Sequence, residues 1–284
     1  MRGKTMLLLL AAVLAAAFLA GCSAKQEALP QAEEVPLTVH CFSAGKADAF
    51  LLYTENSAVL IDCGEKGFGK EIVGYCEENG IEKLDALIIT HFDKDHVGGA
   101  AKVLKSLAVE AVYQSNSPKD STEYSNYLEA LSLAGIEART LREDVSFALD
   151  GLIWQIDAPA EVSYADDPSN NSSLIVRVTD GTCGLLFMGD AEDARTEEYL
   201  AQDPSPAAFL KVPHHGRWQE SLKTLIERIC PQLAVVTSSE EEPEDAETLA
   251  LLEEGGAQIV LTREGEADIF CDGQTVCLKE CPQR

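Results

Sequence analysis

Short apolar runs alternate along the chain with amphipathic stretches, a pattern typical of a mixed α/β domain. Strands are predicted at residues 37–42, 49–53, 57–62, 84–90, 109–114, 145–149, 152–156, 173–178, 183–188, 209–212, 233–237, 258–261, 267–271 and 275–278. Helices are predicted at residues 66–79, 100–107, 121–134, 191–201, 220–229 and 246–254. Hairpins and then strand–helix alternation occur in each half, with no clear repeat or linker between the halves. The pattern therefore predicts one domain of two sheets with helices outside.

Capping and turn residues mark where several of the predicted helices and strands end. Ser121 is a candidate N-cap, and Gly135 is a candidate stop for the same helix. Asp180-Gly181 is a favourable turn pair, so the strands on either side of it are predicted to form a hairpin.

The first 21 residues are predicted to be an export signal. Two basic residues precede the apolar run Met6–Ala20, which is short for a membrane span. The run ends Leu19-Ala20-Gly21-Cys22, which resembles a bacterial lipobox and implies that Cys22 becomes the lipidated first residue. A cleaved signal with a spare cysteine and a short uncleaved anchor are the alternatives. We expect an exported protein anchored at the outer face of the cytoplasmic membrane, or at the outer membrane if the organism has one.

Residues 22–36 have the composition of a flexible tether, which leaves residues 37–284 for the domain. The chain has 284 residues, is 46% hydrophobic and carries a formal charge of -26. Such acidity argues against a protein that holds nucleic acid by a broad basic surface, although metal ions could still grip a polyanion.

Nine cysteines are present, including Cys22. Three of them, Cys41, Cys63 and Cys183, lie in apolar strand-like runs, where a buried thiol is the ordinary interpretation. Three more cluster near the C-terminus, and a disulfide among them stays open as a hypothesis. These are Cys271, Cys277 and Cys281. No C-x-x-C pair occurs, so the sequence does not favour a cysteine-built metal site.

The densest group of chemically active side chains is the run His91–Gly99. Two histidines and two aspartates fall in its first six residues, directly after the strand predicted at 84–90. Extended backbone would put His91, Asp93 and Asp95 on one side of the chain. His96 could then join them only through a bend, which the glycines that follow would help. Imidazole with carboxylate suits Zn²⁺, Mn²⁺ or iron better than Ca²⁺. The alternative is a solvated acidic turn with two surface histidines.

Three more groups stand beside the ends of other predicted strands. They are Asp190, the pair His214-His215 and the pair Asn170-Asn171. Alone, Asp190 could be a helix cap and the histidines could belong to a polar loop. Because all these groups fall beside buried strands, the sequence predicts that the fold gathers them into one site.

The order and spacing of these groups resemble the metallo-β-lactamase superfamily over roughly residues 37–273. Within it, the chain resembles the hydrolase domain of the competence protein ComEC/Rec2 and its free-standing relatives. The matching segments are Gly45–Asp48, Leu60–Gly64, Thr90–Gly99, Asn170–Leu174, Met188–Asp190 and Leu210–Gly216. The resemblance implies a four-layer αββα sandwich with metals in a groove at one edge.

The resemblance further implies two divalent metal ions, Zn or Mn, and a metal-activated hydroxide as the nucleophile. One ion would lie on the His91 and Asp93 side, the other on the side of Asp95 and His96, and Asp190 would bridge them. The residues assigned to metal are His91, Asp93, Asp95, His96, Asp190 and His214, with Asn171 as a weaker candidate.

Two residues are expected to act in catalysis. Asp95 would orient the attacking water as well as bind metal. His214 is expected to be a ligand because it lies nearer the strand end, which leaves His215 to meet a phosphate oxygen or the leaving group.

Three segments depart from the pattern. No histidine stands near Asn171, where the superfamily usually has a third one, although the ComEC/Rec2-related branch also commonly has asparagine there. Arg217–Glu220 replaces expected serines, and Thr237–Glu242 replaces a segment with glycine, asparagine or histidine. The acidic residues of the last segment would repel a nucleic-acid backbone.

The sequence thus predicts an exported, lipid-anchored, metal-dependent hydrolase of phosphodiesters. A metallohydrolase of carboxylic esters, lactones or amides is one alternative, and a catalytically impaired surface binding protein that keeps the fold is another. Expected partners are the membrane, through Cys22, and a small ester substrate, with nucleic acid disfavoured by charge.

Overall fold

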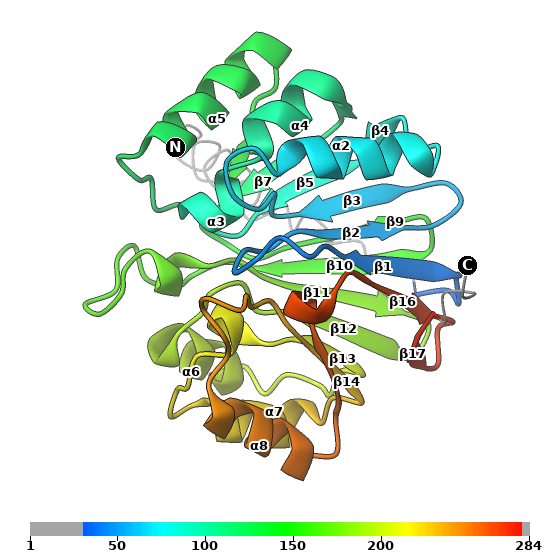
Figure 1. Cartoon of the computed structure of the whole chain (residues 1–284), viewed down its shortest axis with the longest axis vertical. Coiled ribbons are helices and arrows are strands. Elements are labelled where there is room, and N and C mark those ends of the chain that lie inside the picture. Colours follow the sequence, from blue (N-terminus) through cyan, green and yellow to red (C-terminus); the bar gives the residue numbers. More distant parts are fainter. Residues whose placement is uncertain (1–30, 280–284) are drawn as a thin grey trace, which may run out of the picture.

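Two β-sheets pack face to face, and helices cover the outer face of each (Figure 1). The computed structural model describes residues 31–279. The αββα sandwich expected from the sequence is confirmed. The expected export signal and Cys22 lie outside the described residues, as does Cys281.

The first sheet has eight strands. In spatial order they are β17 (Val276–Leu278), β16 (Ala267–Cys271), β1 (Leu37–Cys41), β2 (Phe50–Tyr53), β3 (Ala58–Ile61), β5 (Ala86–Ile89), β7 (Val112–Gln114) and β8 (Arg139–Thr140). The last four run parallel, and the others pair antiparallel. Over its outer face lie α2 (Gly69–Glu78), α4 (Ala100–Ser106), α5 (Thr122–Ala134) and the two-strand pair β4 (Lys83–Leu84) and β6 (Ala108–Val109).

The second sheet has seven strands. In spatial order they are β15 (Gln258–Leu261), β14 (Leu233–Val236), β13 (Phe209–Lys211), β12 (Cys183–Phe187), β11 (Ile175–Asp180), β10 (Leu152–Asp157) and β9 (Val145–Leu149). The first four run parallel. The helices on its outer face are α6 (Asp193–Ala201), α7 (Leu222–Ile229) and α8 (Ala246–Glu254). Within residues 31–279, no helix has the length and apolar character needed to cross a bilayer.

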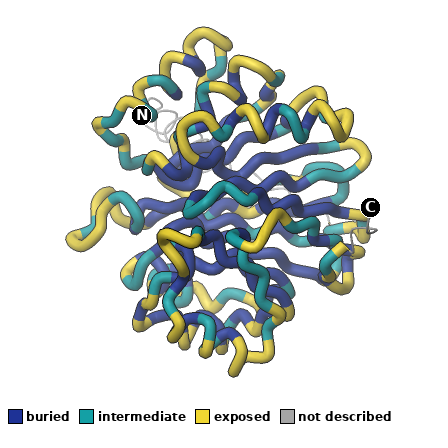
Figure 2. The backbone as a smooth tube through the Cα atoms, in the orientation of Figure 1, coloured by how far each residue is buried: buried dark blue, intermediate teal, exposed yellow. Residues whose placement is uncertain are grey.

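The central strands are buried on both faces, which explains their continuous apolar sequences. In β12, Cys183, Leu185 and Phe187 enter the core between the sheets, while Leu186 packs under the helices. The period of two expected for a strand is therefore present even though both of its faces are apolar. Figure 2 shows the buried strands at the centre and the exposed helices around them.

Local signals in the sequence are confirmed where they can be checked. The Ser121 hydroxyl accepts a hydrogen bond from the Tyr124 backbone at 3.2 Å, and Gly135 ends α5 in the left-handed conformation. Strands β11 and β12 form the hairpin expected at Asp180-Gly181.

Contacts of the domain begin before the expected boundary at residue 37. The Glu33 backbone donates to the Gly151 carbonyl and accepts from Gly181, both at 2.9 Å. The Val35 backbone donates to the Asp180 carboxylate at 2.9 Å. The last residues of the expected tether are therefore docked on the sandwich.

Candidate metal centre

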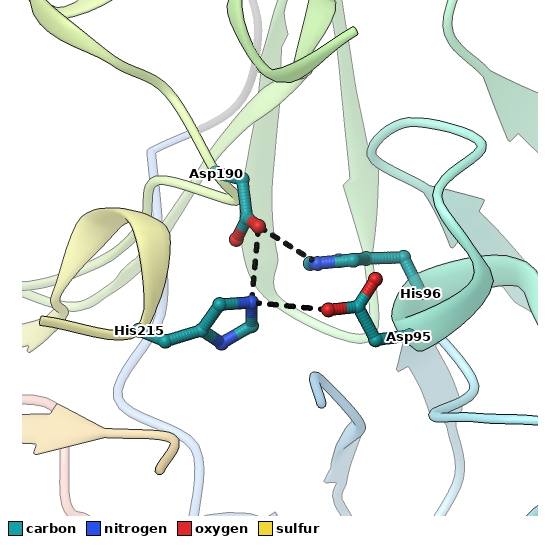
Figure 3. Close-up of side chains that lie close together, drawn as sticks. All are labelled: Asp95, His96, Asp190 and His215. Atoms are coloured by element: carbon teal, nitrogen blue, oxygen red, sulfur yellow. Dashed lines mark ion pairs between the residues drawn. The ribbon is translucent and has the colours of Figure 1, made fainter. Parts of the chain in front are cut away.

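Four buried side chains from three segments converge on one point at an end of the sandwich (Figure 3). Asp95 and His96 belong to the short helix α3 (Lys94–Val97), Asp190 follows β12, and His215 lies in the turn η2 (Pro213–Gly216) after β13. Their candidate ligand atoms all lie within 4.8 Å of one another. The fold therefore brings together groups that are up to 120 residues apart by subtraction (215 − 95).

Asp190 is the hub of this cluster. Its Oδ2 lies 3.2 Å from His96 Nε2 and 3.0 Å from His215 Nε2. Asp95 Oδ2 lies 3.6 Å from the same nitrogen of His215. Two imidazoles and two carboxylates at this spacing form a set of donors that suits a zinc-type ion.

The segment that carries Asp95 and His96 is a helical turn. The expectation of extended backbone there is wrong, because Asp93 begins the turn and its carbonyl accepts from the His96 backbone at 3.0 Å. The two glycines that follow serve a different purpose from the expected bend. A Cβ on Gly98 would lie 2.5 Å from the Lys66 backbone nitrogen, so this position must be bare for the turn to pack against the loop after β3.

Asp62 orients His96. Its Oδ2 lies 2.8 Å from His96 Nδ1, and its Oδ1 accepts from the Thr90 backbone at 2.8 Å. The Thr90 hydroxyl also donates to Oδ2 at 2.6 Å. A carboxylate on Nδ1 keeps a proton on that nitrogen and turns Nε2 toward Asp190.

His215, rather than His214, points into the cluster. His215 Nδ1 lies 3.0 Å from the Thr237 hydroxyl, which donates to Asp48 Oδ1 at 2.6 Å. His214 is partly exposed and turns to the rim, where its Nδ1 lies 3.2 Å from Glu192 Oε1. The geometry therefore favours His215 for the ligand position that sequence reasoning assigned to His214.

Backbone conformation causes this exchange. His214 and His215 both have positive φ, at 46° and 55°, directly after Pro213. Because two consecutive residues adopt the left-handed conformation, their side chains do not point in the directions expected for an extended chain. Proximity to the strand end therefore does not decide which histidine faces inward.

A second pair of expected ligands lies beside the cluster. The buried His91 ring lies beside the His96 ring, with centroids 4.1 Å apart and the planes tilted by 50°, and its Nε2 lies 3.9 Å from Asp93 Oδ1. Asp93 is also ion-paired with Lys119 and accepts from the Ser169 hydroxyl. His91 and Asp93 thus lie next to each other, and the Lys119 ammonium group already pairs with the Asp93 carboxylate.

The structure does not bring Asn171 to the cluster. Its side-chain oxygen accepts from the backbone N–H groups of Glu192 at 3.2 Å and Arg195 at 3.1 Å. Its amide nitrogen donates to the Asp166 carbonyl at 2.9 Å. The side chain is therefore engaged at the start of α6.

Lys211 and Asp48 are site residues to which the sequence reasoning gave no role. Lys211 is buried on β13, forms an ion pair with Asp48 and donates to the Gly189 carbonyl at 2.8 Å. Its ammonium nitrogen also lies 3.5 Å from Asp190 Oδ1. A charged residue inside an apolar strand is the signal that would have marked it, since such a charge is rarely buried without a partner.

The pKa values follow from these contacts. Burial opposes ionisation of Asp190, but the neighbouring charges of His215, His96 and Lys211 hold its pKa well below the usual range. Burial likewise opposes protonation of His215, yet the neighbouring carboxylates of Asp190, Asp48 and Asp95 raise its pKa to about 10. The pKa of His96 is also raised, against burial, by the surrounding aspartates.

Two further pKa values describe the surroundings of the cluster. Burial, with the nearby charge of His96, lowers the pKa of His91 to about 4, so this imidazole is neutral near pH 7. At the rim, burial raises the pKa of Glu192 to about 7 despite a hydrogen bond from Asn170 that lowers it.

The donor atoms fit a metal ion. Within the described part of the chain, Nε2 of His91, His96 and His215 are all buried and make no hydrogen bond. Their Nδ1 atoms have polar neighbours, so the Nε2 atoms are left facing the cluster, where a metal ion would displace any proton that they carry. Buried ring nitrogens without hydrogen-bond partners cost free energy unless a metal ion binds them.

A carboxylate–imidazole centre at the strand ends of an αββα sandwich defines a metal-dependent hydrolase. The chain belongs to the metallo-beta-lactamase superfamily, whose family profile matches residues 43–236. The matched region contains all four residues of the cluster.

Similar curated proteins are larger than this chain. Recombination protein 2 of Haemophilus influenzae is 29% identical over 211 residues, which is 72% of this chain and 24% of that protein. ComE operon protein 3 of Bacillus subtilis is 27% identical over 172 residues, or 60% and 22%. Competence protein ComA of Neisseria gonorrhoeae is 29% identical over 220 residues, or 76% and 28%. The chain thus spans under a third of each relative, and these similarities agree with the branch that its motifs indicated.

Solved structures share the fold. The metallo-beta-lactamase fold protein YhfI of Bacillus subtilis superposes with a TM-score of 0.54 at 13% identity, covering 81% of this chain and 98% of that one. A putative metal-dependent hydrolase of Parabacteroides distasonis gives 0.50 at 12% identity, covering 80% and 93%. At such identities the likeness concerns the fold alone.

Proposed function

We propose that this protein hydrolyses phosphodiesters of small substrates at the Asp95, His96, Asp190 and His215 cluster. The observation that carries the proposal is the convergence of these four buried donors within 4.8 Å. Support for a phosphodiester comes from the relatives, which are named for recombination and competence and are 27% to 29% identical.

A divalent ion at the cluster would polarise a phosphoryl oxygen and lower the pKa of a water molecule. The protein's own groups then divide the remaining work. Asp190 and His96 are held in place by Lys211 and Asp62, so little reorganisation is needed when substrate arrives. Asp95 reaches the cluster from α3, and its Oδ2 lies 3.6 Å from His215 Nε2. This position suits Asp95 to orient the attacking water.

The rim supplies the proton donor in this proposal. His214 and Glu192 lie 3.2 Å apart, and Asn170 donates to the Glu192 carboxylate at 2.7 Å. A leaving alkoxide needs a proton from a group that is partly exposed and close to the metal. We therefore assign to the His214–Glu192 pair the contact with the leaving group that the sequence assigned to His215.

The number of metal ions is part of the proposal. The four-residue cluster would hold the first ion, Zn or Mn. His91 and Asp93 would contribute to a second ion, but the Lys119 ammonium occupies Asp93 and must move away for that ion to bind. We therefore expect unequal affinities at the two positions.

One observation favours the alternative of a neutral substrate, such as a carboxylic ester or lactone. Two cations near the turn η2 are neutralised, since Lys46 lies 3.6 Å and Arg217 lies 3.8 Å from the Glu242 carboxylate. Phosphate recognition by free side-chain cations is therefore weak, and long polyanions would be repelled.

A substrate panel distinguishes these activities. The full chain, purified in detergent and loaded with Mn²⁺ or Zn²⁺, is assayed with bis-p-nitrophenyl phosphate, p-nitrophenyl acetate, a lactone and single-stranded DNA. We expect turnover of the phosphodiester that EDTA abolishes. Turnover of the carboxylic ester or lactone alone would select the alternative, and metal binding without turnover of any of them would favour a binding protein.

Export and lipid anchoring at Cys22 form a separate proposal, supported by the Leu19-Ala20-Gly21-Cys22 motif. Cys22→Ser should release the protein from the membrane fraction of its host, with Cys230→Ser as the matched control. Equal membrane retention of the two variants would contradict it.

A further inference from the structure

A pair of thiols lies at the opposite end of β12 from Asp190. Cys183 is the first residue of β12 and Cys271 is the last of β16, so the pair spans the two sheets. Both side chains are buried in the core between the sheets, and the turns that adjoin the two cysteines contact each other. We propose that Cys183 and Cys271 form a disulfide that joins the two sheets when the protein folds in the presence of an oxidising disulfide.

Two turns, one from each sheet, hold the thiols together. The backbone N–H groups of Thr182 and Cys183 both donate to the Gly273 carbonyl, at 2.8 and 3.2 Å. A Cβ on Gly181 would lie 2.7 Å from the same oxygen, so the turns meet backbone to backbone. Because Gly273 is two residues from Cys271, these contacts hold the start of β12 against the end of β16, and a disulfide requires such a close approach of the two backbones.

A buried carboxylate stands beside the pair. Asp180 Oδ1 accepts from the Val35 backbone at 2.9 Å. Its Oδ2 is buried, and in residues 31–279 no nitrogen or oxygen donor reaches it. In the proposal, the Cys271 thiol is the proton donor to this carboxylate. Burial raises the pKa of Asp180, which makes the carboxylate a stronger proton acceptor than an exposed aspartate.

The reaction is a thiol–disulfide exchange with an external disulfide such as oxidised glutathione. The Cys183 sulfur attacks one glutathione sulfur, so that a mixed disulfide forms and one glutathione leaves with the Cys183 proton. Cys271 then attacks the Cys183 sulfur, and its proton passes through Asp180 to the second departing glutathione. Two protein thiols are oxidised, and one external disulfide is reduced to two thiols.

Burial of the pair sets the order of events. Residues Glu33–Val35 cover this end of the sandwich through their contacts with Gly151, Asp180 and Gly181. The first exchange therefore belongs to folding, before this segment docks, and the second step follows as the turns pack. The finished bond lies at the end of β12 remote from the metal-binding cluster, where it can stabilise the sandwich without touching that cluster.

Sequential alkylation tests the proposal on the full chain. The protein is unfolded and reduced in detergent, refolded with oxidised and reduced glutathione, and then denatured and treated with a first alkylating reagent. Reduction and a second reagent follow, and peptides are read by mass spectrometry. We expect the second label on Cys183 and Cys271, and the first label on Cys63 and Cys76, which lie under the helices.

Variants make the outcome decisive. Cys183→Ser should leave Cys271 with the first label, whereas the control Cys277→Ser should leave the pair oxidised. The oxidised protein should also melt roughly 5–10 °C above the reduced protein. First label on both cysteines of the refolded wild type, or pairing of Cys271 with Cys277 or Cys281, would overturn the proposal. Asp180→Asn should slow closure of the bond about tenfold, and an unchanged rate would remove Asp180 from the scheme.

Discussion

His215 Nε2 lies 3.0 Å from Asp190 Oδ2, while the adjacent His214 turns away to Glu192. These neighbours form a matched pair for mutation, because both follow Pro213 with left-handed backbone. His215→Ala should weaken binding of the first metal by on the order of 100-fold or more, since an inner donor is lost. His214→Ala should leave that affinity within about threefold. Isothermal titration with Zn²⁺ measures both, and equal losses in the two variants would contradict the assignment.

The same pair separates binding from proton transfer. If His214 and Glu192 serve the leaving group, His214→Ala should lower kcat for an alkyl phosphodiester by roughly 10²-fold with metal content unchanged. A p-nitrophenolate leaving group needs little help from an acid, so the loss should be much smaller for bis-p-nitrophenyl phosphate. Equal losses for both substrates would remove the proton-donor role.

Asp62 acts through His96, because its Oδ2 lies 2.8 Å from His96 Nδ1. Asp62→Asn keeps the shape but removes the charge, and it should cost about 10–100-fold in metal affinity. Asp150→Asn, a change in a turn remote from the cluster, is the control. Metal affinity of Asp62→Asn equal to that of the control would show that Asp62 has only a structural role.

Lys119 is predicted to restrict the second metal. Its ammonium group pairs with Asp93, whose Oδ1 lies 3.9 Å from His91 Nε2. Lys119→Ala should therefore strengthen binding of the second ion by about tenfold or more, with the first ion unaffected. Elemental analysis across a Mn²⁺ titration measures the stoichiometry, and Lys102→Ala is the surface control. Weaker binding of the second ion in Lys119→Ala would contradict the prediction.

Lys211 and Asp48 form a buried pair whose halves depend on each other. Lys211→Met leaves the buried Asp48 charged without its ammonium partner, which should lower the free energy of unfolding by about 3–5 kcal/mol. The double variant Lys211→Met/Asp48→Asn should recover part of that loss, because the uncompensated charge is gone. Urea unfolding with EDTA present provides the measurement. A double variant less stable than Lys211→Met would argue against a simple pair.

Much of the architecture followed from apolar periodicity. Alternating apolar runs separated by capping and turn residues located the long strands and the six principal helices, and Ser121, Gly135 and the turn at Asp180 ended elements as expected. Short pieces such as β4, β6 and β8 could not be predicted, because two-residue strands form only where a neighbour in space offers hydrogen bonds.

The site was harder to predict than the fold, because side-chain direction depends on backbone detail. The segment at Asp95 is helical, and His214 and His215 have left-handed backbone, which spacing along the chain does not show. Asn171 stood at the right place in the sequence, yet its amide is bound to backbone groups at the start of α6. Metal-type residues could thus be predicted as a group, but not which of two adjacent histidines enters the cluster.

Anomalous diffraction from crystals of the full chain soaked in Zn²⁺ would locate the metal ion among these side chains. We expect a zinc peak about 2.0–2.2 Å from His96 Nε2, His215 Nε2 and carboxylate oxygens of Asp95 and Asp190. His214 should be outside bonding distance of that ion. A zinc ion bonded to His214 instead of His215, or a fully loaded crystal with no peak at the four-residue cluster, would contradict it.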